Sequence, residues 1–414
     1  MSNSVIEAQY PVDFREDFAG QLGSHLRDRH SLVLIGMRRI GISNFLRFFL
    51  YHPGISKTYI KDSQPHLFVP VDLNDLVELE LFPFWILTLK RIVDAAQQSS
   101  LKENDQKTLQ TIFLDCIQSQ DLFLTIDGIK KSLLKILGAG YLPDIFFIRF
   151  DRLTKSFTPE FLANLESLKE ATHHKLSIVF TAFRPLSVIS PEVFGHVSLS
   201  LIDDQLYLKL AQEKDMQIVL QSNIKKYVLQ LNPKIRASLL KLAGGYIQYL
   251  QLALIILHQE SLMPPSDKQL YTMLIENERI KLQSEELWES LNPLEQETLL
   301  KLERGDKLTQ QDKQNSSYLW ETGLISENGK IRIFSPIFEN FLQERLKEHS
   351  NGTVNVEFSK KEYSLFKFLE ENLNEVCERE AIIEAVWPEE EALGVSDWAI
   401  DRLIARVRNK LKQQ

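Results

Sequence analysis

Cysteine is almost absent from this chain, and its scarcity narrows the classes of protein to consider. Only Cys116 and Cys377 occur among 414 residues. They lie far apart in the sequence and fit no spacing typical of a metal site or a redox motif. The simplest interpretation is a reducing, cytoplasmic environment.

Two further features are missing from the sequence. The segment Met1–Glu7 lacks the basic-then-apolar layout of a targeting signal, and no apolar run approaches the length needed to cross a bilayer. We therefore expect a soluble protein with no membrane partner. A net basic charge is also missing, because the formal net charge is −8. Any contact with nucleic acid must then come from a local basic face.

Apolar residues make up 44% of the sequence and are spread evenly, so a chain of 414 residues should form several domains, each with its own core. Strand-like apolar runs at 67–71, 145–150 and 177–181 alternate with helical stretches such as 84–96 and 161–172. This alternation predicts βαβ units and a parallel α/β sheet covered on both faces.

Beyond Asp204 the pattern becomes helical and resembles a helical lid. A helix at 293–302 and a hairpin around Asn328-Gly329 then suggest a winged helix, and the polar stretch 347–353 resembles a linker. The predicted domains are 1–205 (P-loop NTPase-like α/β), 206–280 (helical lid), 281–348 (winged helix) and 349–414 (a second winged helix, which ends the chain).

The stretch Leu32–Leu46 has the layout of a phosphate-binding loop. An apolar strand leads into Gly36 and Gly41, which have four residues between them, and Ser43 opens an apolar-periodic helix. The pattern G-x-x-x-x-G-K-[ST] is complete except for its lysine, which is replaced by Ile42.

Replacing the lysine affects binding and catalysis differently. Backbone amides and the helix N-terminus could still hold an anion, while the absence of one charged donor costs about 1.5–3 kcal/mol of binding. Catalysis suffers more, because charge developing on the transferred phosphoryl group would lack its fixed counter-charge. The loop alone leaves three alternatives: an ATPase, a nucleotide-binding switch without turnover, or a scaffold kept for its shape.

The ends of neighbouring strands supply further candidates. We expect Asp151 directly after the strand 145–150, at the position where an acid would hold Mg²⁺. A second acid that activates water often follows the first one, and Arg152 replaces it here. Thr181 and Arg184 lie at the end of the third strand, and Arg184 could contact a γ-phosphate. The alternative for Asp151-Arg152 is a solvated turn at the end of a core strand, and the alternative for Arg184 is a surface arginine before Pro185.

Taken together, these motifs resemble the STAND-type signal-transduction ATPases of the AAA+ kind. The resemblance covers roughly residues 8 to 346 and includes Phe14-Arg15-Glu16, the glycine loop, Asp151, Thr181 to Arg184 and Gly244-Gly245-Tyr246. It implies that ATP or ADP, with Mg²⁺, is the ligand. The candidate nucleotide-binding residues are Arg15, Gly36, Arg38, Arg39, Gly41, Ser43, Asn44, Asp151, Thr181, Arg184 and Gly245. Ile42, Arg152 and Ile247 depart from the family pattern and predict little or no hydrolysis.

The end of the chain carries a second resemblance. The pattern Phe358-Ser359-x-x-Glu362-Tyr363, then Ala385-Val386-Trp387, then Ser396 to Leu411 resembles the OmpR/PhoB-type winged helix of bacterial response regulators. In its last helix an apolar stripe leaves basic residues on the remaining surface, which suits contact with duplex DNA. The candidate DNA-binding residues are Ser396, Trp398, Arg402, Arg406, Arg408, Lys410 and Lys412.

The family usually continues from this helix into a β-hairpin wing, whereas this sequence stops at Gln414. We therefore expect that a homo-oligomer or a protein partner helps to hold DNA. The sequence predicts a cytoplasmic, bacterial, DNA-binding transcriptional regulator whose P-loop module is degenerate and does not hydrolyse nucleotide. The alternatives are an active NTPase switch that oligomerises on a signal, and a protein-interaction scaffold.

Overall fold

A parallel sheet of five strands organises the first part of the computed structural model, which describes residues 5–195, 201–259, 266–328, 330–351, 358, 360–373, 375–387 and 397–411. The strands are β1 (Leu32–Ile35), β2 (His66–Asp72), β3 (Leu142–Ile148), β4 (Ser177–Ala182) and β5 (Asp204–Tyr207), in the order β2-β3-β4-β1-β5. All their pairings are parallel, which confirms the predicted sheet.

The fifth strand was not predicted. Asp204–Tyr207 pairs with β1 at the edge of the sheet, and only Leu206 of its side chains is buried. An edge strand of four mostly polar residues has no apolar run to reveal it. The predicted boundary at 205 therefore falls inside a strand, and the first compact unit, Met1–Met37 with Gly41–Lys209, ends four residues later.

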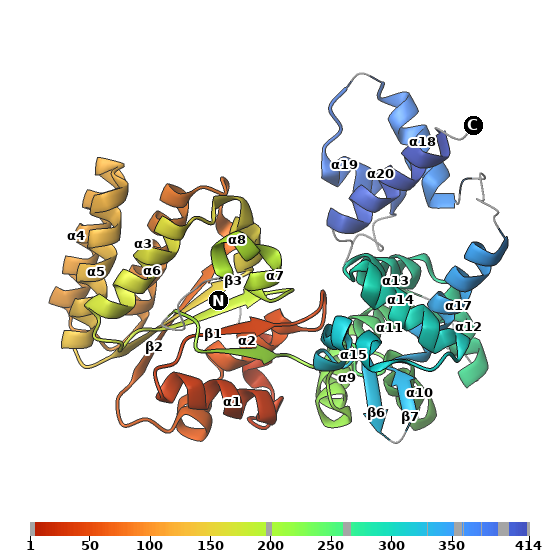
Figure 1. Cartoon of the computed structure of the whole chain (residues 1–414), viewed down its shortest axis with the longest axis horizontal. Coiled ribbons are helices and arrows are strands. Elements are labelled where there is room, and N and C mark those ends of the chain that lie inside the picture. The colour runs from red at the N-terminus through yellow and green to blue at the C-terminus, as the bar shows by residue number, and fades with distance from the viewer. Residues whose placement is uncertain are drawn as a thin grey trace. The chain divides into compact units, whose positions relative to one another are not determined.

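Helices cover both faces of this sheet (Figure 1). Phe146 and Phe147 are neighbours on β3 and so point to opposite faces. Phe146 lies against Phe49, with ring centroids 6.4 Å apart, and Phe147 against Phe84, at 5.0 Å. Phe49 and Phe84 belong to two different helices, α2 (Ile42–Tyr51) and α3 (Leu81–Gln98), which therefore pack on opposite faces.

The helices described in the first unit include the predicted stretches 84–96, within α3, and 161–172, which corresponds to α6. Their bounds are α1 (Glu16–Arg27), α2 (Ile42–Tyr51), α3 (Leu81–Gln98), α4 (Glu103–Ser119), α5 (Leu122–Gly138), α6 (Pro159–Ala171), α7 (Leu186–Ile189) and α8 (Pro191–Phe194), with the short turns η1 (Ile6–Gln9), η2 (Ser56–Ile60), η3 (Leu73–Asp75) and η4 (Phe150–Ser156).

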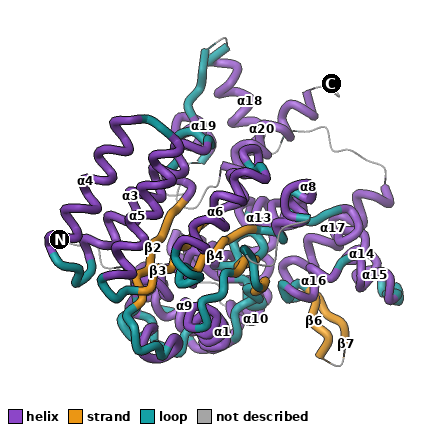
Figure 2. The backbone as a smooth tube through the Cα atoms, turned by 60° about the vertical axis from the view of Figure 1, so that its left-hand side comes forward, coloured by secondary structure: helices purple, strands orange, loops and turns teal. Residues whose placement is uncertain are grey.

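The second unit, Arg38–Ile40 with Leu210–Gln414, is mainly helical (Figure 2). Its first helices are α9 (Glu213–Tyr227), α10 (Pro233–Ala243), α11 (Ile247–Gln259), α12 (Asp267–Glu276) and α13 (Glu278–Glu289). They fit the helical character predicted for 206–280.

A winged-helix order follows, as predicted. The helices α14 (Pro293–Arg304), α15 (Gln310–Asn315) and α16 (Ser317–Glu321) precede an antiparallel hairpin of β6 (Ile325–Asn328) and β7 (Lys330–Ile333). The next helix, α17 (Pro336–Asn351), includes most of the stretch predicted to be a linker, so that prediction is wrong for 347–351. The polar residues there are compatible with a helix, and polarity alone does not end one.

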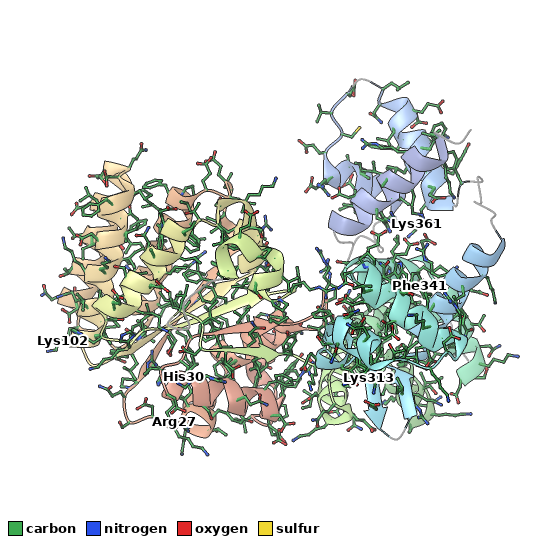
Figure 3. The ribbon with its side chains drawn as sticks, viewed as in Figure 1. Arg27, His30, Lys102, Lys313, Phe341 and Lys361 are labelled. Atoms are coloured by element: carbon green, nitrogen blue, oxygen red, sulfur yellow. The ribbon has the colours of Figure 1, made fainter. Side chains whose placement is uncertain are left out.

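The last helices are α18 (Lys360–Glu371), α19 (Arg379–Val386) and α20 (Asp397–Leu411). They enclose a small core that includes Leu365, Trp387 and Leu403, each fully buried. Lys361, labelled in Figure 3, lies over the Trp387 ring with its Nζ atom 5.3 Å from the centroid. Trp387 is thus a core residue of this group of helices.

Gly244 provides a test of the packing in the second unit. It caps α10 with φ +59°, and a Cβ atom there would lie 2.0 Å from the carbonyl oxygen of Phe334. Left-handed backbone alone costs an alanine about 1–2 kcal/mol. We expect Gly244→Ala to destabilise the chain by more than this, because the clash with backbone adds to the strain.

Thermal unfolding followed by circular dichroism measures the effect. Gly305→Ala is the matched control, because Gly305 caps α14 with φ +83° and a Cβ atom there meets nothing within 4 Å. Equal losses of stability in the two variants would contradict the packing described.

Candidate functional site

The glycine loop joins β1 to α2. Gly36 donates its backbone N–H to the Ala182 carbonyl at 3.2 Å, which fixes the start of the loop at the end of β4. Gly41 has φ +106° and caps α2 with no hydrogen bond from a side chain. The first-turn amides of α2 are therefore not occupied by a side-chain cap, as an anion-binding helix N-terminus requires.

Arg149, and not Asp151, stands directly after the Mg²⁺-candidate strand. β3 ends at Ile148, and Asp151 belongs to the turn η4, so the prediction that Asp151 directly follows the strand is wrong. The sequence 145–150 is apolar enough to suggest a longer strand, but the chain turns at Arg149, which has φ +59°. The first residue after the strand is therefore a cation, and Asp151 lies two residues further on, in η4.

Two polar groups hold Arg149. Its Nη2 atom lies 2.6 Å from Oδ2 of Asp72 at the end of β2, and its backbone N–H donates to Oγ1 of Thr181 at 2.7 Å. Thr181 is buried, and its hydroxyl accepts this backbone bond. Among the described residues there is no cluster of three or more His, Cys, Asp or Glu side chains that could hold a metal ion.

Other candidate nucleotide-binding residues form hydrogen bonds to neighbouring segments of the first unit. Arg15 is buried, has φ +53° and donates from Nη1 to the Lys209 carbonyl at 2.8 Å. Asn44 donates from Nδ2 to Oε1 of Glu7 at 3.2 Å. Arg184 follows β4 by two residues and is partly exposed. The structure thus assigns Arg15 and Asn44 contacts that stabilise the fold.

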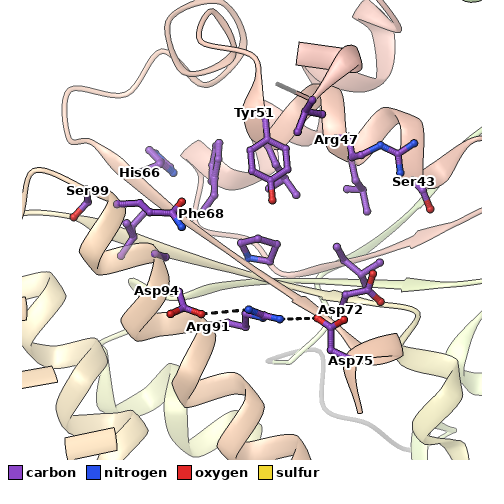
Figure 4. A pocket seen from close by; sticks show the side chains of 18 of the residues that line it. Ser43, Arg47, Tyr51, His66, Phe68, Asp72, Asp75, Arg91, Asp94 and Ser99 are labelled. Atoms are coloured by element: carbon purple, nitrogen blue, oxygen red, sulfur yellow. Dashed lines mark hydrogen bonds and ion pairs between the residues drawn. The ribbon is translucent and has the colours of Figure 1, made fainter. Parts of the chain in front are cut away.

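A groove with a volume of 830 Å³ runs along β2, with Ser43 among its lining residues (Figure 4). Its arginines are ion-paired. Arg91 bridges Asp75 at 2.7 Å and Asp94 at 3.2 Å, while Arg47 contacts Glu7 at 2.6 Å and Arg149 contacts Asp72. These charges neutralise one another, so the groove presents no uncompensated cationic cradle.

The centre of the glycine loop contacts α13. The Tyr246 hydroxyl donates to the Arg38 carbonyl at 2.8 Å and accepts from Nε2 of Gln283 at 3.1 Å. Arg39 Nε lies 3.6 Å from Oε1 of Glu286. Burial raises the pKa of Tyr246, so the phenol remains a proton donor at neutral pH. Sequence reasoning missed Gln283 and Glu286, because neither belongs to a motif.

The neighbouring glycine has a close backbone contact. Gly245 has φ +86°, and its carbonyl accepts from the Ala211 N–H at 2.9 Å. A Cβ atom there would lie 2.6 Å from the Ala211 carbonyl oxygen. Glycine is therefore required for packing at this position, apart from any role near a nucleotide.

The basic helix α20 has the predicted apolar stripe, with Ile400, Leu403 and Val407 buried. Most of its described basic side chains are ion-paired. Arg402 Nη2 lies 2.7 Å from Oε1 of Glu289, which belongs to α13. Arg406 Nη1 lies 3.5 Å from Oε2 of Glu285, also in α13.

Glu362 of α18 also binds two of these cations. Its carboxylate is fully buried and lies 2.8 Å from both Arg406 Nε and Lys410 Nζ. Arg408 is exposed. Of the remaining DNA candidates, Ser396, Lys412 and the side chain of Trp398 lie outside the described residues.

Glu285 lies among these cations in a partly buried place, where loss of water disfavours its charged form. Burial raises the pKa of its carboxyl group, although Arg406, Arg345 and Arg402 each lower it. The charges around Glu285 therefore do not fully replace the water that its carboxylate has given up on folding.

These features describe a parallel α/β domain with a glycine loop, joined to further, mainly helical domains. Residues 352–414 match the family described as "Transcriptional regulatory protein, C terminal". No curated protein matches the chain. No helix among the described residues is both long and apolar enough to cross a membrane.

Several solved structures align with most of the chain. A Walker-type ATPase of Pyrococcus abyssi is 15% identical with a TM-score of 0.49, and the match covers 80% of this chain and 95% of that one. The ORC2 protein of Aeropyrum pernix, in ADPNP and ADP complexes, is 12% identical with a TM-score of 0.48 and the same coverage. The ORC1 protein of Aeropyrum pernix in complex with DNA is 14% identical with a TM-score of 0.42, covering 80% and 92%.

Tyr246 allows a test of the contact between the loop and α13. Tyr246→Phe removes a hydroxyl that bonds both the Arg38 carbonyl and Gln283 Nε2, and leaves Gln283 Nε2 with only its 3.3 Å bond to Glu286. We expect a loss of about 1 kcal/mol in the free energy of unfolding, the usual net contribution of such hydrogen bonds. Urea unfolding measures it, with Tyr363→Phe as control because Tyr363 is 57% exposed. A loss no larger than that of the control would show that these bonds do not hold the loop.

Proposed function

We propose that this protein is a DNA-binding transcriptional regulator whose degenerate STAND/AAA+-like module binds ATP or ADP without hydrolysing it. The observation that carries the proposal is the basic helix α20 within the segment that matches transcription-regulator C-terminal domains. The proposed setting is the bacterial cytoplasm. The proposed assembly is a homo-oligomer or a complex with a protein partner that supports DNA binding.

The proposed DNA contact uses the basic side of α20. Its buried stripe fixes the helix on α18 and α19, while Arg402, Arg406 and Arg408 occupy the remaining surface. Arginine binds phosphate and guanine edges through a planar fork of donors. Contacts to phosphates position such a helix, and contacts to base edges select the sequence.

The proposed nucleotide contact uses backbone more than side chains. The amides of Gly41, Ile42 and Ser43 would hold phosphate oxygens at the N-terminus of α2, as expected for this type of loop. Bound Mg²⁺ would supply charge neutralisation, but the residues present do not fit it, because the guanidinium of Arg149 directly follows the strand and Asp151 lies two residues further on, in η4. Binding without turnover is the role that these residues support.

DNA binding by the full chain tests the proposal. The double substitution Arg402→Ala, Arg408→Ala should weaken binding to duplex DNA at least tenfold. It should also reduce the slope of log K against log [salt] by about one unit for each phosphate that an arginine no longer neutralises. Fluorescence anisotropy with a labelled duplex measures both quantities. Arg406 is left intact because it helps to neutralise the buried Glu362.

The control for this experiment replaces three exposed lysines of the α4–α5 region, Lys102, Lys107 and Lys131, with alanine. It removes more positive charge than the double variant. If the control weakens DNA binding as much as the double variant does, binding is nonspecific. If the unaltered protein binds no DNA, the scaffold alternative is favoured.

Nucleotide binding requires a separate test. Ile42→Lys restores a charged donor and should tighten binding of a fluorescent ATP analogue roughly tenfold or more, the equivalent of about 1.5–3 kcal/mol. Val77→Lys, at a side chain that is 98% exposed, is the control for added charge. The unaltered protein should show no ATP hydrolysis above background. Clear turnover would favour an active NTPase switch.

A further inference from the structure

One face of α13 carries a stripe of three glutamates and a leucine. Glu278, Leu282, Glu285 and Glu289 follow one another at intervals of four, three and four residues, which places them along one side of the helix. The glutamates are only partly exposed, with 27%, 14% and 31% of their side-chain surfaces accessible. Acidic residues at half-buried positions are stabilised by cationic partners. The helix α20 supplies partners to all three glutamates, and Arg345 of α17 adds a contact to Glu285 at 3.4 Å.

The arginines of α20 match this stripe in antiparallel order. Arg402 Nη2 lies 2.7 Å from Glu289, while Arg406 Nη1 lies 3.5 Å from Glu285 and 3.7 Å from Glu278. The two arginines are four residues apart, as are Glu285 and Glu289, so successive turns of the two helices pair.

An apolar contact accompanies the ion pairs. Leu282 is 4% exposed and belongs to the same hydrophobic cluster as Leu365, Trp387 and Leu403 of the terminal domain. Leu282 is buried among residues of α18 and α20, so α13 packs against these helices through an apolar contact as well as through ion pairs. The contact is therefore a packed interface and not only a set of ion pairs between long side chains.

We propose that α13 is an intramolecular competitor of DNA for α20. Its glutamates occupy the guanidinium groups of Arg402 and Arg406 in place of DNA phosphates or base edges, so the terminal domain must leave α13 before α20 enters a groove. The inference rests on the proposed function, because it concerns the same arginines. It adds a regulatory step that occurs within one chain.

The same helix also contacts the glycine loop. Gln283 directly follows Leu282, and Glu286 directly follows Glu285, so both side chains point about 100° around the helix axis from the glutamate stripe. They contact Tyr246 and Arg39. A ligand that moves Arg38 or Arg39 would therefore act on the helix that holds α20.

The test is a full-length variant in which Glu278, Glu285 and Glu289 are all replaced by glutamine. Its affinity for duplex DNA should rise about tenfold, because a larger fraction of molecules has α20 available. The matched control is Glu78→Gln, Glu170→Gln, Glu321→Gln, which removes the same charge at exposed positions elsewhere. The control should change affinity far less than the α13 variant.

A second variant weakens the same interface without changing charge. Leu282→Ala should also raise DNA affinity, by at least about threefold. Circular dichroism and thermal unfolding verify that each variant is folded. Agreement between the two variants would support competition by α13, whereas unchanged or weaker DNA binding in both would overturn it.

The outcomes separate the inference from the proposed function. If the unaltered chain binds DNA through Arg402 and Arg408 but neither α13 variant binds more tightly, the inference alone fails. If neither the unaltered chain nor the variants bind DNA, both fail together. If the charge control tightens binding as much as the α13 variant, general repulsion explains the effect and the inference is wrong.

Discussion

The pairing of carboxylates on α13 with guanidinium groups on α20 is the interaction on which the second unit depends. Pairs at partly exposed positions contribute little singly, commonly up to about 1 kcal/mol. Here the glutamates and arginines form a network around the buried Leu282. The raised pKa of Glu285 indicates that burial of its carboxylate is not fully compensated. The proposed competition requires that the many phosphates of DNA displace this contact.

The position of α13 connects two features that the sequence separates widely. One stripe of the helix contacts Arg402 and Arg406, and the neighbouring stripe contacts Tyr246 and Arg39. The glycine loop lacks the usual lysine, and Arg149 directly follows β3, where it pairs with Asp72. In the proposed function the loop binds a ligand without phosphoryl transfer, because the charge developing in that step would lack a fixed counter-charge.

Much of the architecture was predictable because its signals are local. The strand before Gly36, the hairpin at 325–333 and the apolar stripe of α20 follow from periodicity and turn chemistry. The strand β5 was missed because a short edge strand buries only one of its four side chains. The stretch 347–351 was mistaken for a linker because its polar residues give no apolar period.

The site was harder to predict because its contacts are not local. Arg149 was predicted to be part of a strand, and only the backbone turn after Ile148 shows that Asp151 does not follow the strand directly. The basic residues of α20 were predicted as a set, but their pairing with glutamates far earlier in the chain has no signal in a single sequence.

Hydrogen–deuterium exchange of the full-length protein, with and without duplex DNA, tests the central claim most directly. If α20 binds DNA after leaving α13, DNA should slow amide exchange in 397–411 and speed it in 278–289. Unchanged exchange in 397–411, with protection appearing elsewhere in the chain, would contradict the account.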